Sequence, residues 1–123
     1  MHLLLIAVFG MAGVLSRYGM DRLVGSFWNK DWPLGTFVIN LFGAFLAGVI
    51  FVAATQRAWS EDMRVALMVG FLGGFTTFSA FSLQSWALWE GGDRGMAVTY
   101  LFLSPVLGLA FATLGVWVGR HWT

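Results

Sequence analysis

The chain has 123 residues, of which 59% are hydrophobic and 11% are charged, and its mean hydropathy is +0.78. Because soluble domains carry about 25% charged residues, this composition excludes a soluble protein and indicates a single membrane domain. The net charge of +1 excludes a nucleic-acid binder that relies on electrostatics. The absence of cysteine excludes disulfides, zinc–thiolate sites and thiol catalysis.

Four stretches are apolar enough to cross a bilayer, whose hydrocarbon core of about 30 Å needs about 20 mostly apolar residues. The first stretch lacks a basic n-region and a small-residue cleavage site, so we expect a retained helix rather than a signal peptide. Pro33 suits the start of the second helix, where its missing N–H costs nothing. Together the stretches predict an all-α integral membrane protein with one four-helix domain (1–123) and spans at about 3–23, 34–54, 63–89 and 96–118.

Charged and aromatic residues support these boundaries, and all seven tryptophans fall near span ends, as is typical of an interfacial belt. Four spans place both termini on one side of a cell (inner or plasma) membrane. Lysine and arginine are nearly balanced between the two faces, whereas a fixed orientation requires an excess on one face. Either the count is too small to be informative, or the chain inserts both ways and pairs as an antiparallel dimer. The residues are Arg57, Arg64 and Arg120 on one face, and Arg22, Lys30 and Arg94, with Arg17 if it reaches the surface, on the other.

Small residues four apart in the second and fourth spans form pairs that favour close helix packing. Such pairs serve either packing within one chain or oligomerisation, and four thin helices enclose so little interior that we expect both. The pairs are Gly43/Ala47, Ala44/Gly48 and Gly115/Gly119.

Polar residues inside the spans are uncharged except for one arginine, and no acidic residue lies deep in any span. A proton-coupled transporter would need a membrane-embedded Asp, Glu or His. The remaining hydroxyls, amides and one guanidinium suit an anion that exchanges its water for hydrogen-bond donors. The alternative is that each Ser or Thr bonds the i−4 carbonyl of its own helix. The set is Ser16, Arg17, Thr36, Asn40, Thr76, Thr77, Ser79, Ser82, Gln84, Ser85, Thr99, Tyr100, Ser104 and Thr113.

The third span combines Gly73-Gly74 with Thr76-Thr77, which are poor helix residues and predict a break in the middle of the membrane. Carbonyls freed by a break can bind Na⁺, and the N-terminus of the following half-helix favours anions. An unbroken helix with a glycine packing surface is the alternative. Phe78 and Phe81 share one helix face and can turn positive ring edges toward an anion, although lipid or core packing is the simpler interpretation.

The stretch "GFLGGFTTFSAFS" (70–82) resembles the signature of the Fluc/CrcB fluoride channels, and "GTFVIN" (35–40) is similar to their second-helix motif. Arg17 resembles the first-helix arginine of that family, and Tyr100 and Ser104 match its fourth-helix polar positions. The resemblance covers the whole chain. It implies an antiparallel, dual-topology homodimer with two fluoride pores and a buried structural Na⁺.

By this resemblance, Phe78 and Phe81 would contact F⁻ through their ring edges, and Asn40 would donate to the ion. Arg17 would lie near the pore entrance or structure the vestibule. Other polar side chains would extend the ion path, and backbone carbonyls of both subunits would bind the Na⁺. The path residues are Thr36, Ser79, Tyr100 and Ser104, and the carbonyls belong to Gly73 and Thr76.

The sequence departs from the family pattern at three positions. Ala80 stands where a Thr is usual, Gln84 where a Glu is frequent, and Gly108 where a serine often continues the polar path. These departures affect the expected ion path rather than the expected fold.

Passive export of cytoplasmic fluoride is therefore the leading functional prediction. A small dual-topology exporter of cationic drugs would require a glutamate in the first span, which has none. A non-catalytic assembly subunit would leave the polar residues purely structural. An enzyme is not expected, because the sequence has no nucleophile–base pair or cluster of metal ligands, and His2 and His121 lie at the chain ends.

Overall fold

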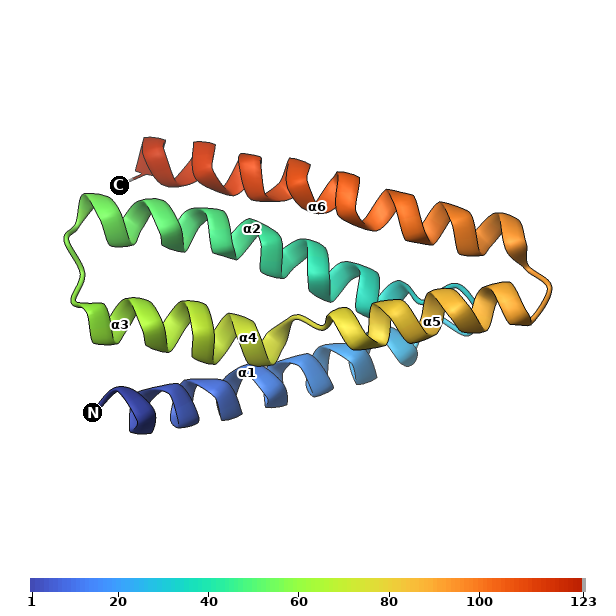
Figure 1. Ribbon diagram of the computed structural model, residues 1–123, viewed down its shortest axis with the longest axis horizontal. Coiled ribbons are helices and arrows are strands. Elements are labelled where there is room, and N and C mark those ends of the chain that lie inside the picture. The colour runs from blue at the N-terminus through green and yellow to red at the C-terminus, as the bar shows by residue number, and fades with distance from the viewer. Residues whose placement is uncertain (123) are drawn as a thin grey trace.

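A computed structural model describes residues 1–122, and Thr123, the last residue of the predicted domain, lies outside the described part. Four helical rods lie side by side, and both chain termini are at the same end of the bundle (Figure 1). The described residues form helices and connecting turns and contain no strand. The elements are α1 (His2–Gly25), α2 (Leu34–Gln56), α3 (Glu61–Val65), the π-helix η1 (Ala66–Phe71), α4 (Leu72–Phe75), α5 (Phe78–Glu90) and α6 (Arg94–Trp122).

The four predicted spans are confirmed. Each rod is long and apolar enough to cross a bilayer, with mean hydropathies between 1.6 and 2.4. The rods begin and end within four residues of the predicted limits, and Pro33 is the residue directly before α2, as expected. The third rod, Glu61–Glu90, is composed of α3, η1, α4 and α5.

The predicted break in the third rod is also confirmed. Thr76 and Thr77 are extended, with φ/ψ of −85°/156° and −146°/118°, so α4 ends before them and α5 begins after them. Gly73, Gly74 and Phe75 still belong to α4, which places the break at Thr76 and Thr77, one residue after the glycine pair. The π-helix that precedes α4 was not predicted; such widened turns are frequent at functional sites.

Glycines bring α2 and α6 into close contact along most of their length. A Cβ on Gly48 would overlap the Ala112 carbonyl oxygen, and a Cβ on Gly115 would overlap that of Phe45. Only glycine permits this approach, because any side chain would push the two backbones apart. The small-residue pairs of these helices therefore serve packing within the chain, which was one of the two interpretations.

The break redirects the third rod from one neighbour to another. Before the break, the rod packs on α1, where a Cβ on Gly13 would overlap the Phe71 carbonyl oxygen. After the break, α5 packs on α6, and Leu88 lies in one buried cluster with Tyr100 and Ala97. Residues on either side of Thr76 and Thr77 are thus placed against different helices.

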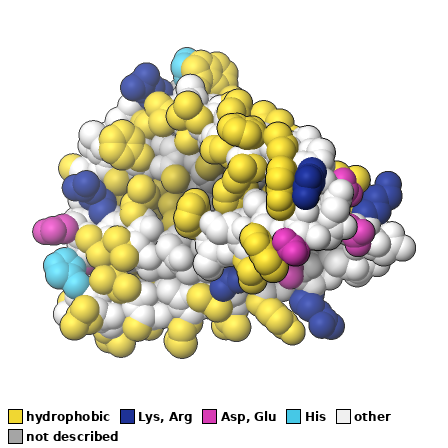
Figure 2. Space-filling view, turned by 45° about the vertical axis from the view of Figure 1, so that its right-hand side comes forward, with side chains coloured by type: hydrophobic (Ala, Val, Ile, Leu, Met, Phe, Trp, Pro, Cys, Tyr) yellow, Lys and Arg dark blue, Asp and Glu magenta, His cyan; other side chains and the backbone are white. Residues whose placement is uncertain are grey.

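The surface is apolar over most of its area. Hydrophobic side chains are spread across the face shown in Figure 2, while most of the charged side chains gather toward its sides. The chain exposes 7801 Å², whereas a compact soluble chain of 13.5 kDa exposes about 6500 Å². A surface of this size and composition is stable against lipid or an apolar partner, and the chain is a multi-pass membrane protein.

Candidate functional site

Asn40 on α2 closes the break in the third rod. Its Nδ2 donates to the Thr77 carbonyl oxygen at 3.0 Å, and its Oδ1 accepts from the Thr77 N–H at 2.9 Å. The side-chain oxygen thus replaces the Gly73 carbonyl, which a continuous helix would have offered to the Thr77 N–H. Backbone groups at membrane depth need such partners, because lipid offers none. The motif "GTFVIN" marked Asn40 as important, but it did not indicate this pairing.

Other backbone groups at the break form hydrogen bonds with a side chain of α1 and with side chains of the third rod itself. The Arg17 Nε on α1 donates to the Gly74 carbonyl oxygen at 3.1 Å. The Thr76 hydroxyl donates to the Leu72 carbonyl oxygen at 2.9 Å, and the Thr77 hydroxyl accepts from the Ala80 N–H at 3.2 Å as the N-cap of α5. Arg17 therefore contacts the carbonyl end of α4.

Three carbonyl oxygens at the break remain without a donor. Among the described residues, none donates to the carbonyls of Gly73, Phe75 or Thr76. Free carbonyls at membrane depth persist where protein, water or an ion satisfies them. This group of oxygens has the chemistry of a cation site such as the Na⁺ site that the sequence predicts.

A cavity of about 400 Å³, which we call the central cavity, lies next to the break. Its wall combines α2, the break, α5 and α6, so the fold brings together four of the predicted pore residues: Asn40, Phe78, Phe81 and Ser104. The other lining residues are Gly43, Ala44, Ala47, Leu72, Thr76, Thr77 and Pro105.

The two predicted pore phenylalanines lie together on the cavity wall. Their ring centroids are 6.0 Å apart and the rings are tilted by 47°. Phe78 is 79% exposed, whereas Phe81 is half-buried and its ring centroid lies 5.1 Å from that of Tyr100. Phe78 thus stands at the open side of the cavity and Phe81 at its closed side.

Ser104 supplies a donor that no described residue uses. Its hydroxyl oxygen is buried and has no hydrogen-bond partner, which is unusual for a buried polar atom. The next residue is Pro105, which cannot donate a backbone hydrogen bond and lies inside α6. The unpartnered hydroxyl in the cavity wall points to a ligand that accepts a hydrogen bond.

Behind Phe81, a partly buried hydrogen bond joins α6 to α5. Tyr100 on α6 is fully buried, and its hydroxyl donates to the Gln84 Oε1 on α5 at 3.0 Å. Thr36 on α2 is also buried, with 5% of its surface exposed. Gln84, a departure from the family pattern, therefore has a defined partner. Thr36 and Tyr100 lie next to the central cavity without lining it.

Besides Thr36 and Tyr100, two further predicted pore residues do not line the cavity. Ser79 is exposed, with its hydroxyl 3.4 Å from that of Thr77, and Arg17 lies at the Gly74 carbonyl instead. The alternative for the hydroxyls, an i−4 bond within the same helix, is correct for four residues: Thr76, Ser85, Thr99 and Thr113. It does not describe Thr77, Tyr100 or Ser104.

The electrostatics of the central cavity favour a small anion. No carboxylate lines it, and Thr77 places the N-terminus of α5, the positive end of the helix dipole, at its edge. Among the described residues, no group of three His, Cys, Asp or Glu side chains could hold a metal ion. The arrangement can bind and pass an ion but offers no nucleophile with a base.

Comparison with known proteins gives a consistent result. The profile of the family described as CrcB-like protein, Camphor Resistance (CrcB), matches residues 4–116. The chain is 38% identical over 123 residues to a protein named Fluoride-specific ion channel FluC from Coxiella burnetii (strain CbuK_Q154), covering 98% of this chain and 99% of that protein.

Two further relatives carry the same name. One from Thermus thermophilus is 42% identical over 116 residues, or 94% of this chain and 93% of that protein. One from Geotalea uraniireducens (strain Rf4) is 40% identical over 118 residues, or 95% of each chain. Because the family profile extends into all four membrane spans, the chain belongs to the CrcB-like protein family.

Proposed function

We propose that this protein is a fluoride-selective channel through which cytoplasmic F⁻ leaves the cell passively. The observation that carries the proposal is the unpartnered Ser104 hydroxyl in the wall of a cavity that also holds Phe78 and Phe81 and no carboxylate. The names of the relatives agree with this function.

Fluoride is small and strongly hydrated, so a pore must replace its water with other donors. The Ser104 hydroxyl can donate, and the Asn40 amide has a second hydrogen because only one is needed for the Thr77 carbonyl. The edges of Phe78 and Phe81 carry partial positive charge. A site with these donors and apolar walls matches a small anion better than a cation, which argues against the alternative of a drug or cation exporter.

The proposal includes an antiparallel homodimer with two pores and one central Na⁺. Three features support it. Phe78 is 79% exposed at the open side of the cavity, where a second chain would complete the wall. The carbonyls of Gly73 and Thr76 accept no hydrogen bond from the described residues and are available to a cation. The near balance of lysine and arginine between the two faces agrees with insertion in both orientations.

The central test is F⁻ efflux from liposomes that contain the purified protein. We expect rapid efflux from the wild type and loss of efflux in Phe78→Ile and Phe81→Ile, with both variants still eluting as folded protein. Trapped F⁻ in wild-type liposomes, beside release by a positive-control channel, would disprove the function. Undiminished efflux in both variants would remove these rings from the pore.

Two further measurements test the assembly. Anomalous scattering from a heavier monovalent cation is expected near Gly73 and Thr76, and its absence there would contradict the Na⁺ site. A cysteine placed after Thr123 should react from both sides of sealed vesicles, since the chain has no other cysteine. Labelling from one side alone would contradict the antiparallel dimer.

A further inference from the structure

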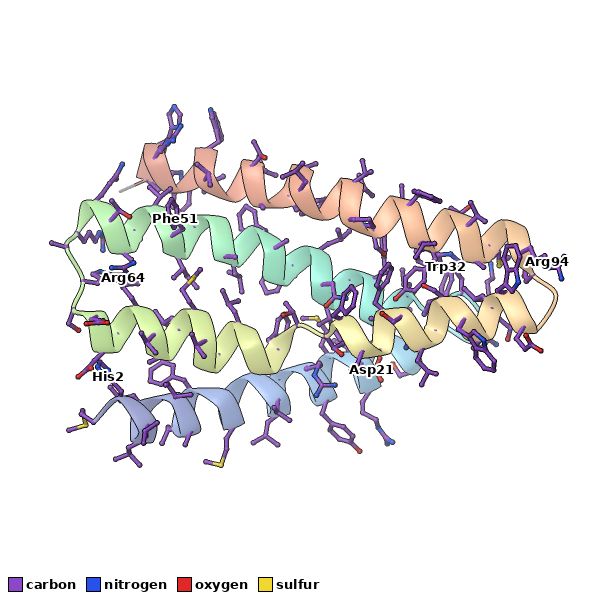
Figure 3. The ribbon with its side chains drawn as sticks, viewed as in Figure 1. His2, Asp21, Trp32, Phe51, Arg64 and Arg94 are labelled. Carbon is purple, nitrogen blue, oxygen red and sulfur yellow. The ribbon has the colours of Figure 1, made fainter. Side chains whose placement is uncertain are left out.

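A second hollow lies at the end of α5 that is far from the chain termini, and we call it the outer hollow. It has a volume of about 350 Å³ and opens between the α1–α2 connection, α5 and the α5–α6 turn. Trp32 and Arg94, which mark this end of the bundle in Figure 3, are the sequence neighbours of two of its lining residues. The lining residues are Asp31, Pro33, Gln84, Ala87, Leu88, Gly91 and Asp93.

One face of α5 lines both the central cavity and the outer hollow. Phe78 and Phe81 line the first, and Gln84, Leu88 and Gly91 line the second. These residues follow one another at steps of three or four, so they form one continuous stripe on the helix.

Side chains in contact with one another connect the walls of the two spaces. The Phe81 ring on the cavity side lies 5.1 Å from the Tyr100 ring, and the Tyr100 hydroxyl donates to Gln84, which lines the outer hollow. A small ion passing along this stripe would therefore exchange the donors of the central cavity for water at Gln84.

We infer that the outer hollow is the water-facing mouth of the anion path and that the carboxylates of Asp31 and Asp93 at its rim slow the arrival of a small monovalent anion. This inference rests on the proposed channel function. In this inference the two aspartates lower the rate of ion entry through their charge and do not contact the bound ion.

No neighbouring cation neutralises the two carboxylates. Among the described residues, the ion pair within 4 Å is that of His2 and Asp62, at the opposite end of the bundle. The two cations nearest in sequence lie over indole rings that do not line the outer hollow. Lys30 Nζ is 5.2 Å from the centre of the Trp28 ring, and the Arg94 guanidinium is 4.8 Å from that of Trp89.

The two carboxylates are not equivalent. Asp93 directly precedes α6, so the positive end of that helix dipole offsets part of its charge. Asp31 lies in the α1–α2 connection, three residues before the start of α2 at Leu34, so the dipole of that helix offsets its charge less. We therefore expect Asp31 to have the larger effect.

Charge neutralisation tests the inference through fluoride efflux. A carboxylate about 8 Å from the path in water slows an anion by about twofold, so Asp31→Asn and Asp93→Asn together should raise efflux about fourfold at low ionic strength. The increase should shrink at about 1 M salt, where the screening length is about 3 Å. Glu61→Gln, which removes a carboxylate at the other end of the bundle, is the matched control and should not change efflux.

The outcomes separate this inference from the function on which it rests. If the wild type and the double variant release F⁻ at the same rate, the role of the aspartates is contradicted and the channel function is not. No wild-type efflux contradicts the channel itself, and a second measurement then still decides whether the outer hollow is an acidic, water-filled mouth.

That second measurement uses Ala87→Cys, because Ala87 is exposed in the outer hollow and the chain has no other cysteine. A cationic methanethiosulfonate reagent should react faster than an anionic one of similar size. Adding Asp31→Asn and Asp93→Asn should abolish this preference, and adding Glu61→Gln should preserve it. A preference that survives the double substitution contradicts the acidic rim, and failure of both reagents to react contradicts a water-filled mouth.

Discussion

The contact between α2 and α6 and the break between α4 and α5 are stabilised in opposite ways. Between α2 and α6, glycines remove side chains so that two unbroken backbones approach closely. At the break, two residues leave the helix, and side chains from α1 and α2 satisfy part of the freed backbone. The first region is stable because its glycines lack side chains, whereas the second depends on the side chains of Arg17 and Asn40.

This difference has a functional consequence. Close packing around Gly48 and Gly115 leaves no room for an ion, so this part of the α2–α6 contact is a scaffold. The break leaves three carbonyls without a donor, and the unpartnered Ser104 hydroxyl lies in the cavity beside it. Polar groups that the fold leaves unsatisfied in a membrane are available to an ion.

Adding a side chain between α2 and α6 should have the largest effect on stability. In Gly115→Leu, the new side chain would overlap the Phe45 carbonyl, so the helices must separate, at a cost of about 3 kcal/mol or more. Gly108→Leu on the same helix is the control, because nothing lies within 4 Å of its Cβ position. Denaturant unfolding in detergent micelles measures both, and equal losses would refute close packing as the cause.

Removing the amide that closes the break should cost nearly as much. Asn40→Leu leaves the Thr77 N–H without a partner and removes the side-chain donor to the Thr77 carbonyl, and we expect a loss of about 1–3 kcal/mol together with loss of F⁻ efflux. Thr55→Val on the same helix is the control, since its hydroxyl bonds only the Phe51 carbonyl of its own helix. If Asn40→Leu unfolds like the control, the break does not depend on this amide.

Removing the hydrogen bond from Arg17 to the Gly74 carbonyl should have a smaller effect. Arg17→Met preserves most of the side-chain length but removes the donor to the Gly74 carbonyl, which should lower the free energy of unfolding by about 1–2 kcal/mol. Arg17→Lys should recover part of the loss, because the ammonium is also a donor. Equal stability of the Met and Lys variants would show that the hydrogen bond contributes nothing.

The smallest effect on stability is expected for Ser104→Ala, because the hydroxyl has no partner to lose. Its free energy of unfolding should change by less than about 0.5 kcal/mol, while F⁻ efflux falls about tenfold if one hydrogen bond to the ion is lost. Thr113→Val on the same helix, whose hydroxyl bonds Leu109, should leave efflux unchanged. A less stable Ser104→Ala protein with full efflux would make Ser104 structural.

The sequence predicted some of these features and missed others for a physical reason. Hydropathy over about 20 residues indicated the four spans, and the poor helix propensity of Gly73, Gly74, Thr76 and Thr77 indicated the break. The same local signals did not reveal the π-helix before α4 or the pairing of Tyr100 with Gln84, because both depend on how neighbouring helices pack.

The sequence by itself thus determined the membrane class, the four spans and the position at which the third one breaks, since these follow from properties of consecutive residues. The tertiary structure decided which groups close the break and which remain free. Asn40 reaches Thr77 across 37 residues and Arg17 reaches Gly74 across 57. Hydrogen bonds over such separations form only when packed helices bring their partners within about 3 Å, and it is this packing that leaves Ser104 unpartnered beside Phe78 and Phe81.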